Sequence, residues 1–173
     1  VCTSPGHHAE IILQLVNAGI NVFTELNLID KDYDLIIARA EENKVVVFMS
    51  STMLYDKRIE TIDKMVKDHK KPITYIYHVG QYLPDWHPWE SYKDFFIGKK
   101  ETNGVREIYA IQLPWLINTF GKIKTVSSVS QKCTDLDIDF PDSIIASFQH
   151  DNGNIGVFTA DVVSRKAITS HLQ

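Results

Sequence analysis

The sequence predicts an α/β segment with a parallel sheet, followed by an α+β segment with a mainly antiparallel sheet. Up to Pro72, short apolar runs alternate with stretches of helical periodicity, roughly ten to fifteen residues long. Beyond Pro72, several β-prone runs follow one another and are separated by turn signals. The 173 residues are 44% hydrophobic and 23% charged, a composition typical of a globular protein that buries a core.

The first segment begins with a β-prone stretch, Val1-Cys2-Thr3, which the turn residues Ser4-Pro5-Gly6 interrupt. We expect residues 1–3 to form the end of a strand. A helix is expected from His7 to Ala18, because apolar residues recur there with helical spacing and Gly19 is a stop signal. Residues 21–25 are expected to form the next strand.

Two more helices and one more strand complete this segment. Asp30 is expected to cap a helix that ends near Asn43. The five apolar residues from Val45 to Met49 are typical of a parallel strand that is buried on both faces. Asp56 is expected to open a third helix, which ends before Pro72. Three strands alternating with helices predict right-handed crossovers and about half of a doubly wound domain.

The second segment, 73–173, is expected to form its own domain beside the first domain, 1–72. Asn and Gly at residues 151–154 predict a hairpin turn, because both tolerate positive φ. A meander-like sheet should result. Its expected elements are a strand at 73–79, an irregular stretch at 80–90, a helix at 106–120, and strands at 123–132, 143–150, 154–163 and 166–172.

Charge and cysteine content exclude several functional classes. Lys and Arg number 18 against 22 Asp and Glu, so no basic excess points to nucleic acid or to an acidic membrane surface. Cys2 and Cys133 lie far apart without a C-x-x-C partner, which argues against a disulfide framework and a structural zinc site. We therefore expect a reducing, cytoplasmic setting. No apolar run is long enough to span a bilayer, and no signal peptide is visible.

Three stretches resemble the Gfo/Idh/MocA family of oxidoreductases. They are Ser4-Pro5-Gly6-His7-His8-Ala9-Glu10, the run from Ala18 to Asn27, and the helix end Trp115-Leu116-Ile117-Asn118-Thr119-Phe120-Gly121. The resemblance covers the chain in order. It implies the C-terminal half of a Rossmann-type parallel sheet plus an open-faced, mainly antiparallel sheet domain. It also implies NAD or NADP as cofactor and hydride transfer to or from a sugar or related polyol.

The sequence departs from the family at the residues that carry chemistry. The family's G-x-G-x-x-G motif has no counterpart here, so we expect the chain to be a fragment lacking that N-terminal part. In the family's E-K-P motif, the glutamate falls on Glu25, the lysine on Leu26 and the proline on Asn27. Its D-x-x-x-H pair falls on Glu107 and Ile111. Leucine and isoleucine cannot transfer protons, so either other residues act or the branch is inactive.

The resemblance places five residues near the cofactor. Glu25 is expected at the carboxyl edge of the parallel sheet, where open α/β folds bind ligands. The alternative for Glu25 is a turn or helix-capping role. The alternative for His7 and His8 is an ordinary structural role in the first turn of the helix. The expected cofactor-binding residues are Ser4, Pro5, His8, Glu25 and Asn27.

The loop from Gln81 to Glu90 holds three aromatic residues, two prolines, one histidine and two carboxylates. It resembles a loop of family members from surface-polysaccharide metabolism. Trp86 and Trp89 are expected to stack on sugar faces, with Glu90 binding hydroxyl groups. His87 is expected to replace the missing acid/base histidine. The alternative is that both tryptophans only pin the loop to the core. Asp85 with His87 gives only two metal ligands, so no metal is expected.

The start of the later helix supplies the remaining candidates. Glu107 inherits the family's aspartate position and is the second expected catalytic residue, beside His87. Arg106 and Gln112 are expected to bind substrate, although Arg106 could simply pair with Glu107. His78, His150 and His171 fall within strands, where structural histidines are the default.

Two hypotheses follow. The first is part of an NAD(P)-dependent oxidoreductase that acts on a sugar or sugar nucleotide in polysaccharide-related metabolism. The second is a non-catalytic sugar-binding or oligomerisation module derived from that family, which Leu26 and Ile111 favour. In both, the partners are a sugar-like small molecule and a second copy of the chain on the C-terminal sheet, with neither nucleic acid nor membrane.

Overall fold

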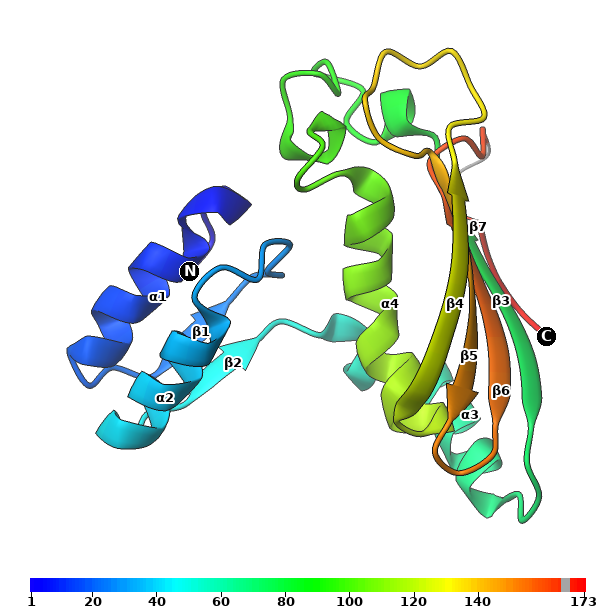
Figure 1. The fold of residues 1–173 in the computed structure, drawn as a ribbon, viewed down its shortest axis with the longest axis horizontal. Coiled ribbons are helices and arrows are strands. Elements are labelled where there is room, and N and C mark those ends of the chain that lie inside the picture. Colours follow the sequence, from blue (N-terminus) through cyan, green and yellow to red (C-terminus); the bar gives the residue numbers. More distant parts are fainter. Residues whose placement is uncertain (166–168) are drawn as a thin grey trace. The chain divides into compact units, whose positions relative to one another are not determined.

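The computed structural model describes residues 1–165 and 169–173. Contacts divide the chain into two compact units, Val1–Ser51 and Thr52–Gln173. The expected boundary at residue 72 is therefore one helix too late. The reason is that the helix α3 (Lys57–Asp68) packs on α4 (Gly104–Phe120), which belongs to the second unit (Figure 1).

The first unit is a small α/β layer. Its elements are α1 (His8–Asn17), β1 (Val22–Thr24), α2 (Tyr33–Asn43) and β2 (Val47–Met49). The two strands pair in parallel, with Val22 opposite Val47. Helices α1 and α2 pack on each other, and Ile12, Val16 and Ile36 form the centre of the core.

Three expectations for this unit were wrong. Val1–Thr3 is not a strand, because only Val1 bonds to the backbone of β1 and the residue after it: its N–H donates to Phe23 O (2.6 Å), and its carbonyl accepts from Glu25 N (2.9 Å). Asp32, not Asp30, precedes α2, and its positive φ of 60° turns the chain into the helix without a side-chain cap. Strand β2 begins at Val47, because Val45 donates its N–H back to Ala40 and closes the helix end.

The second unit contains a five-stranded sheet in the order β4-β5-β6-β3-β7. Strands β4, β5 and β6 form the expected antiparallel meander. Strand β3 lies parallel to β6 and separates it from β7, so the sheet is mixed. The strands are β3 (Thr74–Gly80), β4 (Ile123–Gln131), β5 (Ser143–His150), β6 (Ile155–Asp161) and β7 (Thr169–Leu172). The first residues of the strand expected at 166–172, namely 166–168, lie outside the described residues.

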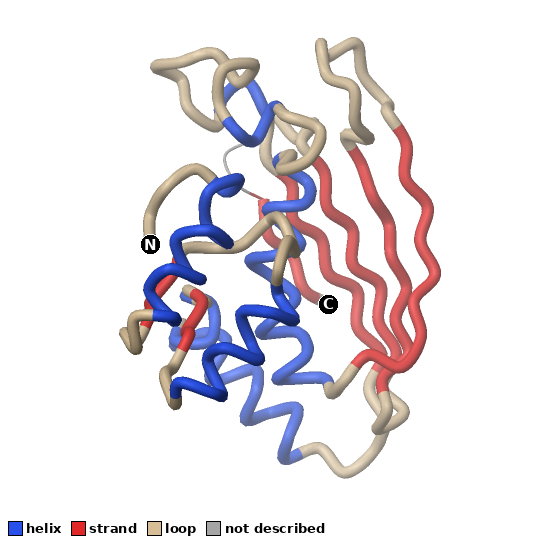
Figure 2. Tube along the Cα trace, turned by 60° about the vertical axis from the view of Figure 1, so that its left-hand side comes forward, coloured by secondary structure: helices blue, strands red, loops and turns tan. Residues whose placement is uncertain are grey.

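One face of this sheet carries the core (Figure 2). Helix α4 contributes Trp115, Leu116 and Phe120, and α3 contributes Ile59. They pack with Tyr75 and other buried side chains of the sheet. In the described part of this unit, no helix covers the opposite face, where several apolar side chains are exposed. The expected fold class, a parallel α/β part followed by an open-faced, mainly antiparallel sheet, is confirmed.

Two local predictions from the sequence, a hairpin turn and a helix cap, are confirmed. Gly153 has a φ of 89° in the turn between β5 and β6, so the expected hairpin is present. Asp56 caps α3 by accepting the Arg58 N–H at 2.8 Å. None of the described helices is both long and apolar enough to cross a membrane.

Candidate functional site

His8 connects two loops of the first unit that were expected to face the cofactor: the segment before α1, at Thr3, and the loop after β1, at Asn27. Its imidazole is 3% exposed. Nδ1 lies 2.6 Å from Asn27 Oδ1, and Nε2 lies 2.8 Å from the carbonyl oxygen of Thr3. Both ring nitrogens are therefore engaged within the chain. His8 fixes the position of Asn27 at the end of β1, and its ring has no nitrogen left for a ligand.

The other expected cofactor residues lie around this bridge. Ser4 Oγ is 2.8 Å from His7 Nδ1, and Pro5 is buried in a short 3-10 turn before α1. Glu25 is exposed directly after β1. The five residues thus gather at the carboxyl end of β1 and the start of α1, as expected for the ligand edge of a parallel sheet.

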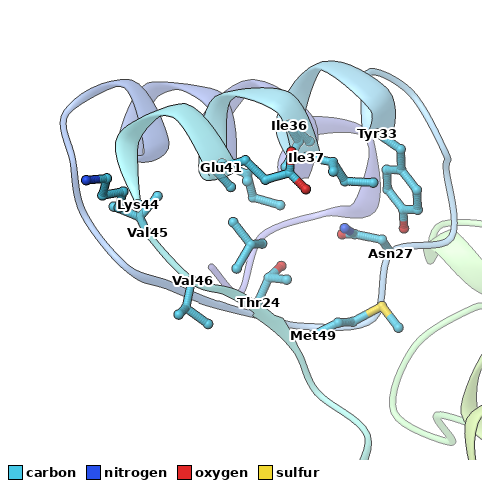
Figure 3. Close-up of a pocket in the computed structure, with 13 residues that line it drawn as sticks. Thr24, Asn27, Tyr33, Ile36, Ile37, Glu41, Lys44, Val45, Val46 and Met49 are labelled. Atoms are coloured by element: carbon cyan, nitrogen blue, oxygen red, sulfur yellow. The ribbon is translucent and has the colours of Figure 1, made fainter.

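A largely apolar pocket of about 560 Å³ lies beside this edge, between α2 and the two strands (Figure 3). Among the expected cofactor residues, it is lined by Asn27 alone. Thr24 and Tyr33 supply further polar groups, and Ile36, Val45 and Met49 are among its apolar residues. The pocket was not predicted from the sequence, because its residues come from two helices, two strands and the loops beside them, which no local motif connects.

In the second unit, His87 is held in a defined orientation. Its Nδ1 lies 2.7 Å from Glu90 Oε1, and its ring stacks between Trp89 and Phe95 at centroid distances of 4.6 and 4.1 Å. A carboxylate only accepts hydrogen bonds, so Nδ1 is the donor in this pair, and Nε2 is the nitrogen that can exchange a proton with a ligand. This carboxylate–imidazole pair is the arrangement that orients a general base.

The two loop tryptophans have different surroundings. Trp86 packs against the start of α4, where a Cβ added to Gly104 would lie 2.9 Å from Trp86 Cζ3. It therefore pins the loop to α4, as the structural alternative proposed. Trp89 is 74% exposed and stacks on His87 instead. A large aromatic face held in solvent by its neighbours is available to a ligand.

The three α4 candidates do not share one surface. Gln112 lines a pocket of about 520 Å³ together with Trp86 and Trp115. Arg106 lines a different groove. Gln112 lies six positions after Arg106, a net rotation of about 240° around the helix axis. Glu107, partly buried, lies next to Arg106 in the first turn.

A buried hydrogen-bond network stands behind Gln112. Its Oε1 accepts from the Tyr77 hydroxyl at 2.9 Å and from Trp115 Nε1 at 2.7 Å. Tyr77 also lies 3.1 Å from Ser170 Oγ. Burial raises the pKa of Tyr77 despite the hydrogen bonds to its oxygen, so the hydroxyl keeps its proton. Sequence analysis missed Tyr77, although the alternation in β3 places it on the core face.

The strand histidines differ from one another. His150 has both nitrogens engaged, by the carbonyl of Gly121 at 2.7 Å and the Tyr75 hydroxyl at 3.0 Å, so it is a structural histidine. His78 Nε2 lies 2.6 Å from Asp161 Oδ2. Among the described residues there is no group of three or more His, Cys, Asp or Glu side chains that could hold a metal ion.

No protein-family model and no curated protein matches the sequence. Solved structures do match over almost the whole chain. A probable dehydrogenase from Thermotoga maritima has a TM-score of 0.82 at 16% identity, with 99% of this chain and 52% of that one aligned. GenD2 from gentamicin A biosynthesis, in complex with NAD, has a TM-score of 0.79 at 18% identity, over 96% of this chain and 48% of that one.

A third match is the WlbA dehydrogenase from Bordetella pertussis in complex with NADH and UDP-GlcNAcA. It has a TM-score of 0.81 at 14% identity, over 98% of this chain and 53% of that one. The chain thus spans about half the length of these structures. At such identities the likeness shows the fold, and the fold implied by the resemblance to Gfo/Idh/MocA proteins is confirmed.

Proposed function

We propose that the chain is part of an NAD(P)-dependent oxidoreductase that moves a hydride between nicotinamide and a sugar or sugar-nucleotide-like substrate. The observation that carries this proposal is the fold match along 96–98% of the chain with dehydrogenases bound to NAD or NADH. One of them also holds a sugar nucleotide, UDP-GlcNAcA. We also propose a role in polysaccharide-related metabolism, which the resemblance of the aromatic loop at residues 81–90 supports.

The residues present fit one side of a dinucleotide site. The carboxyl end of β1 and the start of α1 carry Ser4, Pro5, Glu25 and Asn27, and the buried His8 holds the two loops together. We propose that these residues line the cofactor, NAD or NADP. When bound, it accepts or supplies the hydride. The G-x-G-x-x-G turn that would bind the pyrophosphate is not in the sequence.

His87 and Glu107 are the proposed catalytic residues. In the oxidation of an alcohol, the carbon loses a hydride and the hydroxyl loses a proton. His87 Nε2 is proposed to take that proton, since Glu90 fixes Nδ1 as the protonated nitrogen. Glu107 is proposed to orient the substrate, Trp89 and Glu90 to bind sugar groups, and Trp86 and Gln112 to line the deeper pocket. Arg106 lines a different groove, so its role in substrate binding stays a prediction from the sequence.

A non-catalytic sugar-binding or oligomerisation module is the second candidate. Leu26 and Ile111 favour it, because they stand where the family has its lysine and histidine. Under either proposal we place the protein in the cytoplasm, in keeping with two free cysteines. We also propose a homo-oligomer that forms through the open sheet face, since exposed apolar residues gather there.

The test is turnover of UDP-GlcNAcA by the natural protein with NAD, followed as NADH absorbance. His87→Gln should lower kcat by about a hundredfold or more, because it removes the base and leaves most of the packing. His69→Gln, at the exposed end of α3, is the matched control and should have no effect.

The outcomes separate the two candidates. Turnover that depends on His87 supports the oxidoreductase. Sugar binding without any cofactor binding supports the module. Turnover that His87→Gln leaves unchanged overturns the proposed role of His87, even if the oxidoreductase activity stands.

A further inference from the structure

A small polar pocket of the second unit lies at the opposite end of β3 from the 81–90 loop. Its walls are the end of α3, the stretch that leads into β3, the end of α4 and the turn between β5 and β6. Figure 1 shows that turn at one end of the sheet, whereas β3 passes into the 81–90 loop at the other end. The pocket has a volume of about 280 Å³ and shares no lining residue with the proposed substrate site.

Asn154 fixes the walls of this pocket to one another. Its Oδ1 accepts the Ile73 N–H at 2.8 Å, and its Nδ2 donates to the Phe120 carbonyl at 2.8 Å. The turn, the start of β3 and the end of α4 are thereby joined through one buried side chain. On the same turn, a Cβ added to Gly153 would lie 3.5 Å from Pro72 Cγ, which is ordinary contact. The pocket is therefore formed before any ligand binds.

Three lysines line this pocket, and its described lining contains no carboxylate. Lys67 donates to Asp63 at 2.8 Å. Lys70 and Lys71 have no ion-pair partner in the part of the chain that the structure describes. Helix α3 ends at Asp68. The helix dipole acts within the last turn, so it accounts for Lys67 and not for Lys70 or Lys71.

Thr119 supplies a buried polar group to the same pocket. It lies in the last turn of α4 and lines the pocket, although it is only 4% exposed. Its hydroxyl has no hydrogen-bond partner among the described residues. A buried hydroxyl without a partner is costly. An anion drawn in by the lysines would bring the acceptor that this hydroxyl lacks.

We propose that this pocket binds a phosphate group, with Lys70 and Lys71 as its cations and Thr119 Oγ1 as the buried donor. An ammonium binds phosphate as a point charge, and two unpaired ammonium groups match a dianion better than the single charge of a carboxylate. The volume is at the low end of ligand pockets, which suits a small phosphorylated ligand and is too small for a sugar nucleotide. None of these residues belongs to the proposed cofactor or substrate site, so the proposal goes beyond the proposed function.

The test is equilibrium dialysis of the natural protein against radiolabelled inorganic phosphate, at fixed ionic strength because salt screens exposed charges. One phosphate should bind per chain, and an excess of acetate should not displace it. Replacing both lysines, by Lys70→Gln with Lys71→Gln, should weaken binding about fivefold or more. The matched control, Lys100→Gln with Lys124→Gln, removes two exposed lysines elsewhere in this unit and should leave binding unchanged.

Thr119→Val tests the buried donor separately. It keeps the branched shape of the side chain and removes the hydroxyl, so phosphate binding should weaken about tenfold. Without phosphate, the melting temperature of this variant should not fall, because the hydroxyl has no partner to lose. A structural threonine would give the opposite pair of results.

Three results overturn the proposal. The first is acetate displacing phosphate as well as unlabelled phosphate does. The second is phosphate binding that the Lys70 and Lys71 substitutions leave intact, or that the control pair weakens equally. The third is a Thr119→Val variant that keeps its affinity, or that melts at a lower temperature without phosphate. Neither substrate nor cofactor is present, so these results do not depend on the proposed function.

Discussion

Asp161 shows how a single buried carboxylate is held in this fold. It accepts from His78 Nε2, from the backbone N–H groups of Val163 and Ser164 at 3.0 and 2.9 Å, and from the Ser164 side chain. Burial by itself would raise the pKa of Asp161. The hydrogen bonds outweigh burial and hold the pKa below its ordinary value of 3.8.

This low pKa gives a pH-dependent prediction. A group with a lowered folded-state pKa stabilises the fold above its ordinary pKa, and the stabilisation is lost as the pH falls through the folded-state value. Asp161→Asn should therefore cost about 2 kcal/mol of unfolding free energy at pH 7. The cost should shrink below about pH 4. Urea unfolding at pH 7 and pH 3 measures both values.

Asp139→Asn is the control, since Asp139 is exposed. It should have little effect at either pH. A cost for Asp161→Asn that is the same at pH 7 and pH 3 would contradict the assignment of a stabilising carboxylate.

The candidate site could be predicted from the sequence only where one short segment builds it. The 81–90 loop contains His87, Trp89 and Glu90 together, and the structure holds all three in contact. Gln112 is different, because its partner Tyr77 lies 35 positions away. The opposite surroundings of Trp86 and Trp89 also depend on a distant residue, Gly104, against which only Trp86 packs.

At the scale of elements, α4 positions most of the second unit. Asn103 caps it by accepting the Arg106 N–H at 2.9 Å, while its own amide donates to Lys100 O at 2.8 Å. Pro114 lies inside the helix and cannot donate a backbone hydrogen bond. The Asn103 side chain, by accepting the Arg106 N–H, is a main local determinant of where α4 begins.

Asn103→Ala should lower the free energy of unfolding by about 1 kcal/mol, because it leaves an N–H of the first turn without its acceptor. Asn103→Asp keeps the acceptor and should cost less. Urea unfolding of the three proteins measures the order. Equal stability of the alanine and aspartate variants would show that the cap contributes nothing.

Helices and turns with a strong local signal were predicted well. Elements that depend on pairing between distant strands were predicted poorly. The helix after Asp56 and the hairpin at Gly153 were predicted, because a cap and a positive-φ turn are local. The position of β3 between β6 and β7 could not be predicted. Periodicity indicates which face of a strand is buried, but it does not indicate which strand pairs with it. Val1–Thr3 has strand-like composition, but only Val1 bonds to β1.

At the scale of the whole molecule, the open face of the five-stranded sheet is the feature most in need of a partner. Val129 and Ile145 are cross-strand neighbours there, 69% and 45% exposed. Ile76 and Ile155 are also exposed on neighbouring strands. Several large apolar side chains exposed on one face of a sheet are typical of an interface.

Ile145→Lys tests the proposed homo-oligomer. A lysine at this place would leave an unpaired charge in an interface between two copies, so sedimentation velocity should show the assembly dissociating toward monomers at micromolar concentration. The free energy of unfolding of the monomer should change by less than about 0.5 kcal/mol, because the side chain is exposed within one copy. Met65→Lys, at an exposed apolar position on α3, is the matched control and should leave the assembly intact. Two results would contradict this proposal: a natural protein that sediments as a monomer at every concentration, and an assembly that Ile145→Lys does not weaken. Either would show that this sheet face is not the interface between two copies of the chain.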